Sequence, residues 1–195
     1  MGIVDIAIGT ETNGSISCPS SINGIVGMKP TTGLVSRSGI IPISSSQDTA
    51  GPMGTTVDIV AKTLEVIAGY DENDPATYSI PSNFDFNLSS AINNISLKGI
   101  RLGLLDSKNS NPQVIELHKK LQEIINSLGG ELILIDDDRD YPGDAESFVL
   151  LYEFRVGLEE YLKNANSSMK KLTDIIDFND EQRYRYAIFW TRHFL

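Results

Sequence analysis

The succession of strand, helix and strand in residues 97–136 is the feature that most restricts the fold. The central segment, 111–130, is typical of an amphipathic helix that ends at two glycines, and its apolar stripe contains Val114, Leu117, Leu121, Ile124 and Leu128. The flanking runs LKGIRLGLLDS (97–107) and ELILID (131–136) are typical of strands. Because strands joined through a helix pair in parallel, by a right-handed crossover, the sequence predicts an α/β fold.

The rest of the chain continues this mixture of strands and helices. GIVDIAIG (2–9) alternates apolar residues and predicts a buried strand. Thr55 and Asp58 have the spacing of a capping box at the start of one further helix, which Gly69 ends. The expected helices outside 97–136 are a short one near 18–24, then 55–69, 145–165 and one that begins at 172–179.

The composition excludes several classes of partner. The chain has 195 residues and a formal net charge of −10, which repels phosphate backbones and anionic lipid. We therefore expect neither a nucleic-acid nor a membrane partner, and the lack of a long apolar run or a signal peptide favours a cytoplasmic location. Cys18 is the only cysteine, which excludes an internal disulfide, and we expect it to be buried. The acidic runs 71–74 and 136–140 are interpreted as solvated, so neither a metal nor a cofactor is expected.

The segment from 8 to 30, IGTETNGSISCPSSINGIVGMKP, is rich in small hydroxyl residues and glycine. A strand that enters a glycine-flanked serine, followed by a short helix, can present a nucleophile with backbone N–H groups beside it. Ser15, preceded by Gly14, fits that geometry, although an ordinary Gly/Ser turn would look the same.

A serine nucleophile also needs a base, and the sequence offers no obvious one. His118 lies in an amphipathic helix and is interpreted as a surface or boundary residue, and His193 lies near the end of the chain. Lys29 is the one lysine near the serine, but it precedes Pro30 in a turn and is interpreted as structural.

Residues 9–58 carry a longer pattern of fixed spacing. GTETNGSISCP, GIVGMKPTTGLVSR and SQDTAGPM resemble the motif of the amidase signature family, G-[ST]-[DE]-T-[GN]-G-S-[IV]-x-x-P and its continuation. The segment is most similar to the peptide-amidase branch, with Ser17 where many relatives have arginine. The resemblance implies a mixed β-sheet flanked by helices, of which this chain is an incomplete, internal portion lacking N-terminal and C-terminal parts.

The resemblance also implies the chemistry. The family hydrolyses small amides or peptide amides with a Ser–cis-Ser–Lys triad, so Ser15 would be the nucleophile that forms an acyl-enzyme. The N–H groups around Thr12, Asn13, Gly14 and Ser15 would form the oxyanion hole. The bridging serine and the lysine precede the nucleophile by more than the fourteen residues found here, so we expect both to be absent and the chain to be inactive by itself.

The resemblance suggests one partial domain over 1–195. Its expected parts are a signature core with the nucleophile loop (1–69), a connecting loop (70–96), a strand–helix–strand–helix portion (97–181) and an atypical tail (182–195).

The tail departs from the family and suggests a second hypothesis. With one choice of codons, the DNA for residues 187–194 read one base later encodes Arg-Tyr-Phe-Gly-Gln-Asp-Ile-Phe, which is similar to the family at this point. The alternative to a hydrolase fragment is therefore a non-catalytic remnant of a truncated or frameshifted gene. In either case we expect a homo-oligomer formed through exposed strand edges.

Overall fold

The computed structural model describes residues 2–81, 83–88, 92, 96–105, 111–136 and 140–182. The chain divides into two compact units, which are described separately: Met1–Leu88 with Pro142–Leu195, and Ser89–Tyr141. Of the atypical tail, only Gln182 belongs to the described residues.

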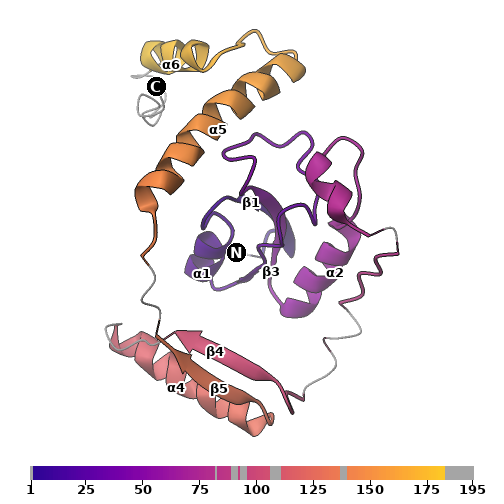
Figure 1. Ribbon diagram of the computed structural model, residues 1–195, viewed down its shortest axis with the longest axis vertical. Coiled ribbons are helices and arrows are strands. Elements are labelled where there is room, and N and C mark those ends of the chain that lie inside the picture. The colour runs from indigo at the N-terminus through magenta and orange to yellow at the C-terminus, as the bar shows by residue number, and fades with distance from the viewer. Residues whose placement is uncertain are drawn as a thin grey trace. The chain divides into compact units, whose positions relative to one another are not determined.

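A three-stranded antiparallel sheet forms the centre of the first unit (Figure 1). Its strands are β1 (Ile6–Glu11), β2 (Val26–Gly27) and β3 (Thr49–Gly54), in the order β1–β3–β2. In the register of β1 and β3, Glu11 lies opposite Thr49. The end of β1 is therefore fixed to the central strand just before the glycine- and serine-rich segment begins.

The expectation of a buried strand at 2–9 is only partly correct. A strand forms, but it begins at Ile6, and the side chains of Ile6 and Ile8 are 40% and 54% exposed. β1 is an edge strand whose ladder pairs it with β3. Alternation of apolar residues indicates a strand, but it does not show whether both faces of that strand are covered.

Two helices of the first unit follow from local signals. α1 (Ser17–Asn23) ends at Gly24, which has a left-handed φ of 63°. α2 (Val57–Ile67) packs on β3, and its Leu64 forms a buried cluster with Val35 and Ala50. The cap of α2 is Thr56, whose hydroxyl accepts from the Ile59 amide, and the expected cap at Thr55 is therefore wrong by one residue.

Two further helices complete the first unit. α5 (Gly143–Asn164) and α6 (Leu172–Glu181) confirm the helices expected at 145–165 and from 172. The buried residues between them are Leu158, Leu162, Leu172 and Ile176. A short 3-10 turn, Pro75–Ser79, follows α2 and contains the buried Thr77.

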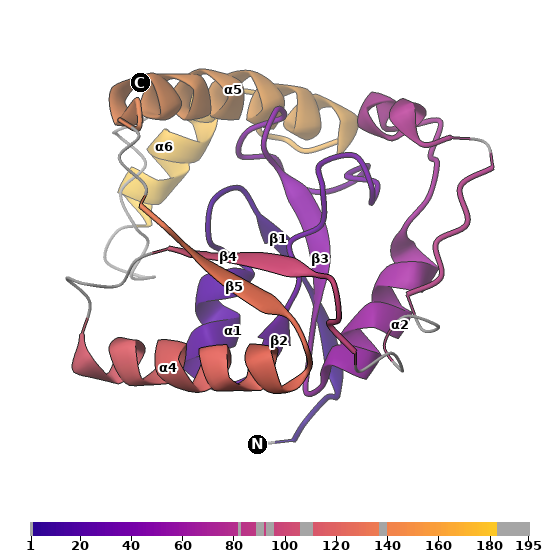
Figure 2. The same ribbon diagram turned by 60° about the horizontal axis from the view of Figure 1, so that its bottom comes forward.

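The second unit confirms the strand–helix–strand prediction. β4 (Arg101–Leu105) and β5 (Glu131–Ile135) pair in parallel, and α4 (Pro112–Ser127) runs along the pair (Figures 1 and 2).

The buried face of α4 differs from the expected stripe. Ile125 is 5% exposed, whereas Leu117 and Ile124 of the stripe are 62% and 56% exposed. The buried residue of this helix is therefore not one of the predicted stripe. No described helix is long and apolar enough to cross a membrane.

Candidate active site

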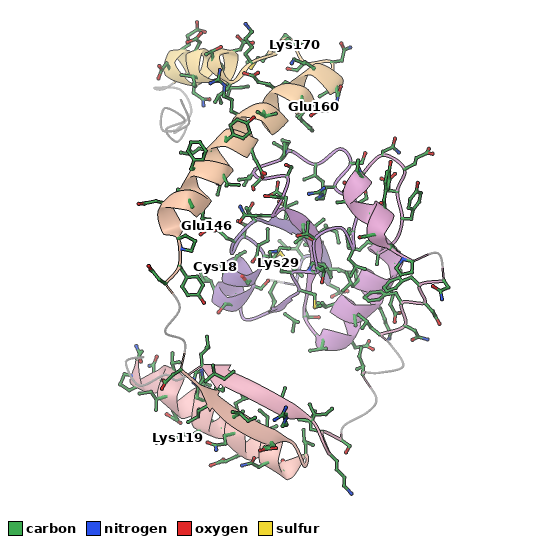
Figure 3. The ribbon with its side chains drawn as sticks, viewed as in Figure 1. Cys18, Lys29, Lys119, Glu146, Glu160 and Lys170 are labelled. Carbon is green, nitrogen blue, oxygen red and sulfur yellow. The ribbon has the colours of Figure 1, made fainter. Side chains whose placement is uncertain are left out.

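Ser15 lies where the sequence places it, in a turn between the end of β1 and the start of α1. Its side chain is exposed. The neighbouring expectation for Cys18 is wrong, because this thiol is exposed in the first turn of α1 (Figure 3). α1 is short, so its outer face remains open to solvent, and a small apolar residue need not be buried there.

The residue after Ser15 anchors the turn. Ile16 is fully buried. A Cβ added to Gly9, Gly27 or Gly51 would come within 3.0–3.1 Å of the Ile16 side chain. These glycines lie on β1, β2 and β3, so their missing side chains leave room in all three strands for the isoleucine. With Ile16 held against the sheet, the adjacent Ser15 is presented at the surface.

A carboxylate at the end of β1 closes the turn from inside. Glu11 is 6% exposed, and its Oε2 accepts hydrogen bonds from the amides of Ile16 and Ser17, both at 2.8 Å. Burial acts to raise the pKa of Glu11, but the two amides, the Ser17 hydroxyl and the charge of Lys29 outweigh it and leave the pKa lowered. Glu11 is therefore ionised at neutral pH.

A second carboxylate fixes the first residue of the turn. The buried Thr12 hydroxyl donates to Oδ1 of Asp48 at 2.6 Å. Oδ2 of Asp48 accepts from the amides of Ile43 and Ser44, at 2.7 and 2.8 Å. Asp48 thus ties the turn to the segment that precedes β3.

Helix α5 contacts both segments. Oε2 of Glu153 accepts from the hydroxyl of the fully buried Ser44 at 2.5 Å, and from the amide and hydroxyl of Ser46 at 3.0 and 2.9 Å. Burial acts to raise the pKa of Glu153, but these donors lower it overall. Near the start of the helix, Glu146 accepts from the side-chain amide of Asn13 at 3.2 Å (Figure 3).

Three backbone N–H groups of the turn have no acceptor in the described part of the chain. The amides of Asn13, Gly14 and Ser15 donate to no residue that the structure describes. Gly14 has a φ of 141°, and a Cβ there would meet no atom within 4 Å. The conformation, rather than lack of space, therefore favours glycine at this position.

Neither of the described candidate bases named from the sequence, Lys29 and His118, is hydrogen-bonded to Ser15. The Ser15 hydroxyl has no hydrogen-bond partner in the described part of the chain, and Lys29 is exposed. His118 belongs to α4, in the other unit, and His193 lies outside the described residues. No cluster of three or more possible metal ligands occurs among the residues described.

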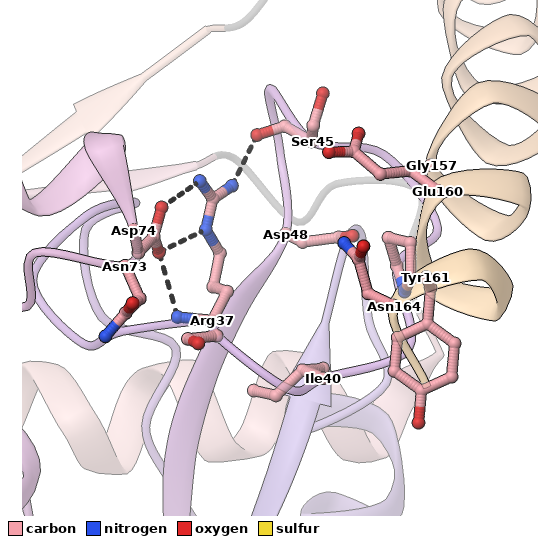
Figure 4. Close-up of a pocket in the computed structure, with 12 residues that line it drawn as sticks. Arg37, Ile40, Ser45, Asp48, Asn73, Asp74, Gly157, Glu160, Tyr161 and Asn164 are labelled. Carbon is pink, nitrogen blue, oxygen red and sulfur yellow. Dashed lines mark hydrogen bonds and ion pairs between the residues drawn. The ribbon is translucent and has the colours of Figure 1, made fainter. Parts of the chain in front are cut away.

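A pocket of about 230 Å³ lies in the first unit, between the segment 37–48 and α5 (Figure 4). The Arg37 guanidinium donates to Asp74 at 2.9 and 3.0 Å and to the Ser45 carbonyl, and the Arg37 amide donates to Asp74 at 2.8 Å. Chiefly because of Arg37, the pKa of Asp74 is lowered to about 2, against the desolvation that burial imposes.

Sequence reasoning missed the roles of several acids that organise these contacts, among them Asp74, Glu11 and Asp48. Asp74, interpreted as part of a solvated loop, is only 4% exposed. Glu11 and Asp48 lie at the acidic positions of the motifs quoted above, and this was the available signal. Their partners could not be inferred from spacing, because Asp48 bonds a residue 36 positions away.

Comparisons with known proteins identify the family of the chain. The Amidase family model matches residues 1–186. A probable amidase of Arabidopsis thaliana is 36% identical over 187 residues, which cover 92% of this chain and 35% of that protein. A protein of Prochlorococcus marinus that forms part of its glutamyl-tRNA(Gln) amidotransferase is 36% identical over 154 residues, covering 76% of this chain and 31% of that protein. The native peptide amidase of Stenotrophomonas maltophilia superposes with a TM-score of 0.89 at 38% identity, covering 98% of this chain and 40% of that one.

The chain therefore belongs to the amidase signature family, and its mixed α/β structure matches the fold of that family. It spans between about a third and two fifths of the length of these relatives.

Proposed function

We propose that Ser15 is the nucleophile of an amide hydrolase. The observation that carries this proposal is the exposed Ser15 hydroxyl on a turn fixed by a buried Ile16, beside three amides that donate to no described residue. The Ser15 oxygen attacks the amide carbonyl carbon and its proton passes to a base. The N–H groups around Thr12, Asn13, Gly14 and Ser15 bind the resulting oxyanion.

The reaction then proceeds through an acyl-enzyme. The C–N bond breaks, the nitrogen takes up a proton and leaves as ammonia or an amine, and the acyl group remains on Ser15. Water adds to this ester, and its collapse frees the carboxylic acid and restores the hydroxyl.

We further propose that this chain by itself turns over amides negligibly. Ser15 has no partner in the described residues that could accept its proton, and loss of a triad member costs up to about 10⁶ in kcat. The family resemblance assigns that role to a cis-serine and a lysine, and no described serine or lysine is hydrogen-bonded to the Ser15 hydroxyl.

The substrate class we favour is a small amide or a C-terminally amidated peptide. The support is the similarity to peptide amidases, at 38–40% identity and TM-scores of 0.85–0.89. No metal or cofactor is needed for this chemistry.

The test measures ammonia released from an amidated dipeptide, with Ser15→Ala as the control. We expect no release above background from either protein. Robust release that Ser15→Ala abolishes would show that the chain has a base of its own, and would contradict the claim of inactivity. Acetyl transfer from p-nitrophenyl acetate tests the nucleophile separately, because this leaving group departs without a proton from the protein.

The exposed apolar residues around β1 favour a second property, self-association. Ile3, Val4 and Ile8 are 81%, 66% and 54% exposed, and β1 is an edge strand. We propose that copies of the chain pair through this edge. Light scattering over a concentration series should show dimers or larger species, and a monomer at every concentration would refute the pairing.

We also propose a cytoplasmic location, supported by the single cysteine and the acidic composition. The alternative to a catalytic role remains a folded remnant of a truncated or frameshifted gene. Coding DNA in which the shifted frame after Ala187 continues as amidase-like sequence would support this alternative.

A further inference from the structure

We propose that Glu11 is a positioning residue, which holds the turn that carries Ser15 by capping α1 from the end of β1. The proposal rests on the proposed role of Ser15 as the nucleophile. It assigns Glu11 a task distinct from that of the oxyanion hole, since Glu11 accepts hydrogen bonds and cannot donate to an oxyanion while it is ionised.

The start of α1 has no cap of its own. Its N-cap residue is Ile16, whose side chain cannot form a hydrogen bond, and no side chain from that position satisfies the first amides. Glu11 supplies the missing acceptor. Its Oε2 binds the amides of Ile16 and Ser17, and its Oε1 lies 3.3 Å from the Ser17 hydroxyl.

The anchor for this cap is rigid at both ends. Glu11 is the last residue of β1, paired opposite Thr49, and its side chain is buried. Ile16 is held in the space left by the glycines of the sheet. The Glu11 carboxylate therefore joins the two ends of the four-residue arc 12–15, and the direction of the Ser15 hydroxyl follows from that closure.

The Glu11 carboxylate and the proposed oxyanion use different backbone amides of the same turn. The N–H groups of Ile16 and Ser17 point to Glu11, which leaves those of residues 13–15 for a developing oxyanion. A carboxylate close to an oxyanion would raise the energy of the oxyanion by repulsion between the two negative charges. Here two amides, one hydroxyl and the nearby Lys29 offset that charge.

Two substitutions at Glu11 separate the effect of its acceptor oxygen from the effect of its negative charge. Both amides bind the same oxygen, Oε2, so the carbonyl oxygen of a glutamine can accept the same two bonds. Glu11→Gln should keep the turn closed with weaker bonds, whereas Glu11→Ala should release it. Asp174→Asn is the matched control, because Oδ2 of Asp174 also accepts from two backbone amides, those of Lys170 and Lys171, at the start of α6 and away from the turn.

The first readout is the rate of Ser15 acetylation by p-nitrophenyl acetate, located by mass spectrometry. Displacement of a reacting group by about 1 Å can cost about 100-fold, so we expect Glu11→Ala to slow the reaction by roughly that factor. Glu11→Gln should stay within about tenfold of the wild type, and Asp174→Asn within about twofold.

The second readout is hydrogen exchange at the amides of Ile16 and Ser17, followed by NMR, which needs no chemistry at Ser15. A neutral acceptor weakens each bond by about 1 kcal/mol relative to a charged one, so exchange in Glu11→Gln should accelerate by roughly fivefold to tenfold. In the wild type the two amide proton shifts should titrate with the Glu11 carboxyl, and in Glu11→Gln this titration should vanish.

The outcomes distinguish the two proposals. Selective acetylation of Ser15 that is as fast in Glu11→Ala as in the wild type would overturn the positioning role and leave the nucleophile in place. Wild-type protein without selective acetylation would refute the nucleophile, and the exchange experiment would still judge the cap. If Glu11→Ala does not fold, unchanged exchange at Ile16 and Ser17 in Glu11→Gln overturns the proposal.

Discussion

Replacement of Asp74 by asparagine should make the protein less stable at neutral pH, by an amount that shrinks in acid. The pKa of Asp74 is about 2 in the folded chain, against an ordinary 3.8. Each unit of difference corresponds to about 1.4 kcal/mol, so ionised Asp74 contributes at most about 2.5 kcal/mol to the free energy of unfolding at pH values above its ordinary pKa. The Arg37 and Ala76 amides donate to different oxygens of Asp74, Oδ2 and Oδ1. Asparagine has a single carbonyl oxygen, so the substitution removes the charge and also the acceptor of one amide, and only the contribution of the charge depends on pH.

The sign follows from proton binding. The unfolded chain takes up a proton at Asp74 at a higher pH than the folded chain does, so acid favours unfolding. The contribution is complete at pH 5 and above, falls to about 1 kcal/mol at pH 3 and is below about 0.5 kcal/mol at pH 2.

Urea unfolding of the wild type and Asp74→Asn, followed by circular dichroism at each pH, measures the difference. The carboxyls of Glu11, Asp71, Glu153 and Asp174, whose pKa values are also lowered, titrate in both proteins and largely cancel. A stability difference that stays constant between pH 7 and pH 2 would refute the assignment of the ion pair as its source.

Two further substitutions test packing and the turn by urea unfolding. Leu64→Ala should destabilise the first unit by about 3 kcal/mol because Leu64 is fully buried. The control Val66→Ala, at an 84% exposed position, should change stability by less than about 0.5 kcal/mol. Equal effects of the two substitutions would contradict the assigned core. Gly14→Ala should lower the free energy of unfolding by about 1 kcal/mol or more because residue 14 has a positive φ, although no atom obstructs the added methyl group. Unchanged stability would show that the turn adopts another conformation.

The elements that sequence reasoning located well are those with local causes. The parallel pair β4–β5 follows from a strand–helix–strand order that leaves few alternatives, and the Ser15 turn follows from a glycine-flanked serine between a strand and a short helix. The ends of α2 and α5 shifted by one or two residues, as expected where caps such as Thr56 compete with neighbours.

The expectations that were wrong concern whether a side chain is buried by tertiary packing. Cys18 and the apolar stripe of α4 are exposed, although their residue types favour burial. Burial depends on which segments pack together, and local pattern carries no information about that. For the same reason the bonds of Asp48 to Thr12 and of Glu153 to Ser44, which span 36 and 109 positions, could not be predicted from local pattern.

The proposed role of the turn, stabilisation of an oxyanion at Ser15, is tested most directly by the rates at which p-nitrophenyl acetate acetylates Ser15 and Ser38. Both serines lie in turns and have a glycine neighbour, so Ser38 is an internal control of matched character. An oxyanion hole contributes about 10²–10³ in rate, so Ser15 should acquire its acetyl group at least about 100-fold faster than Ser38. Equal rates at the two serines would contradict the claim that this turn is built to stabilise an oxyanion at Ser15.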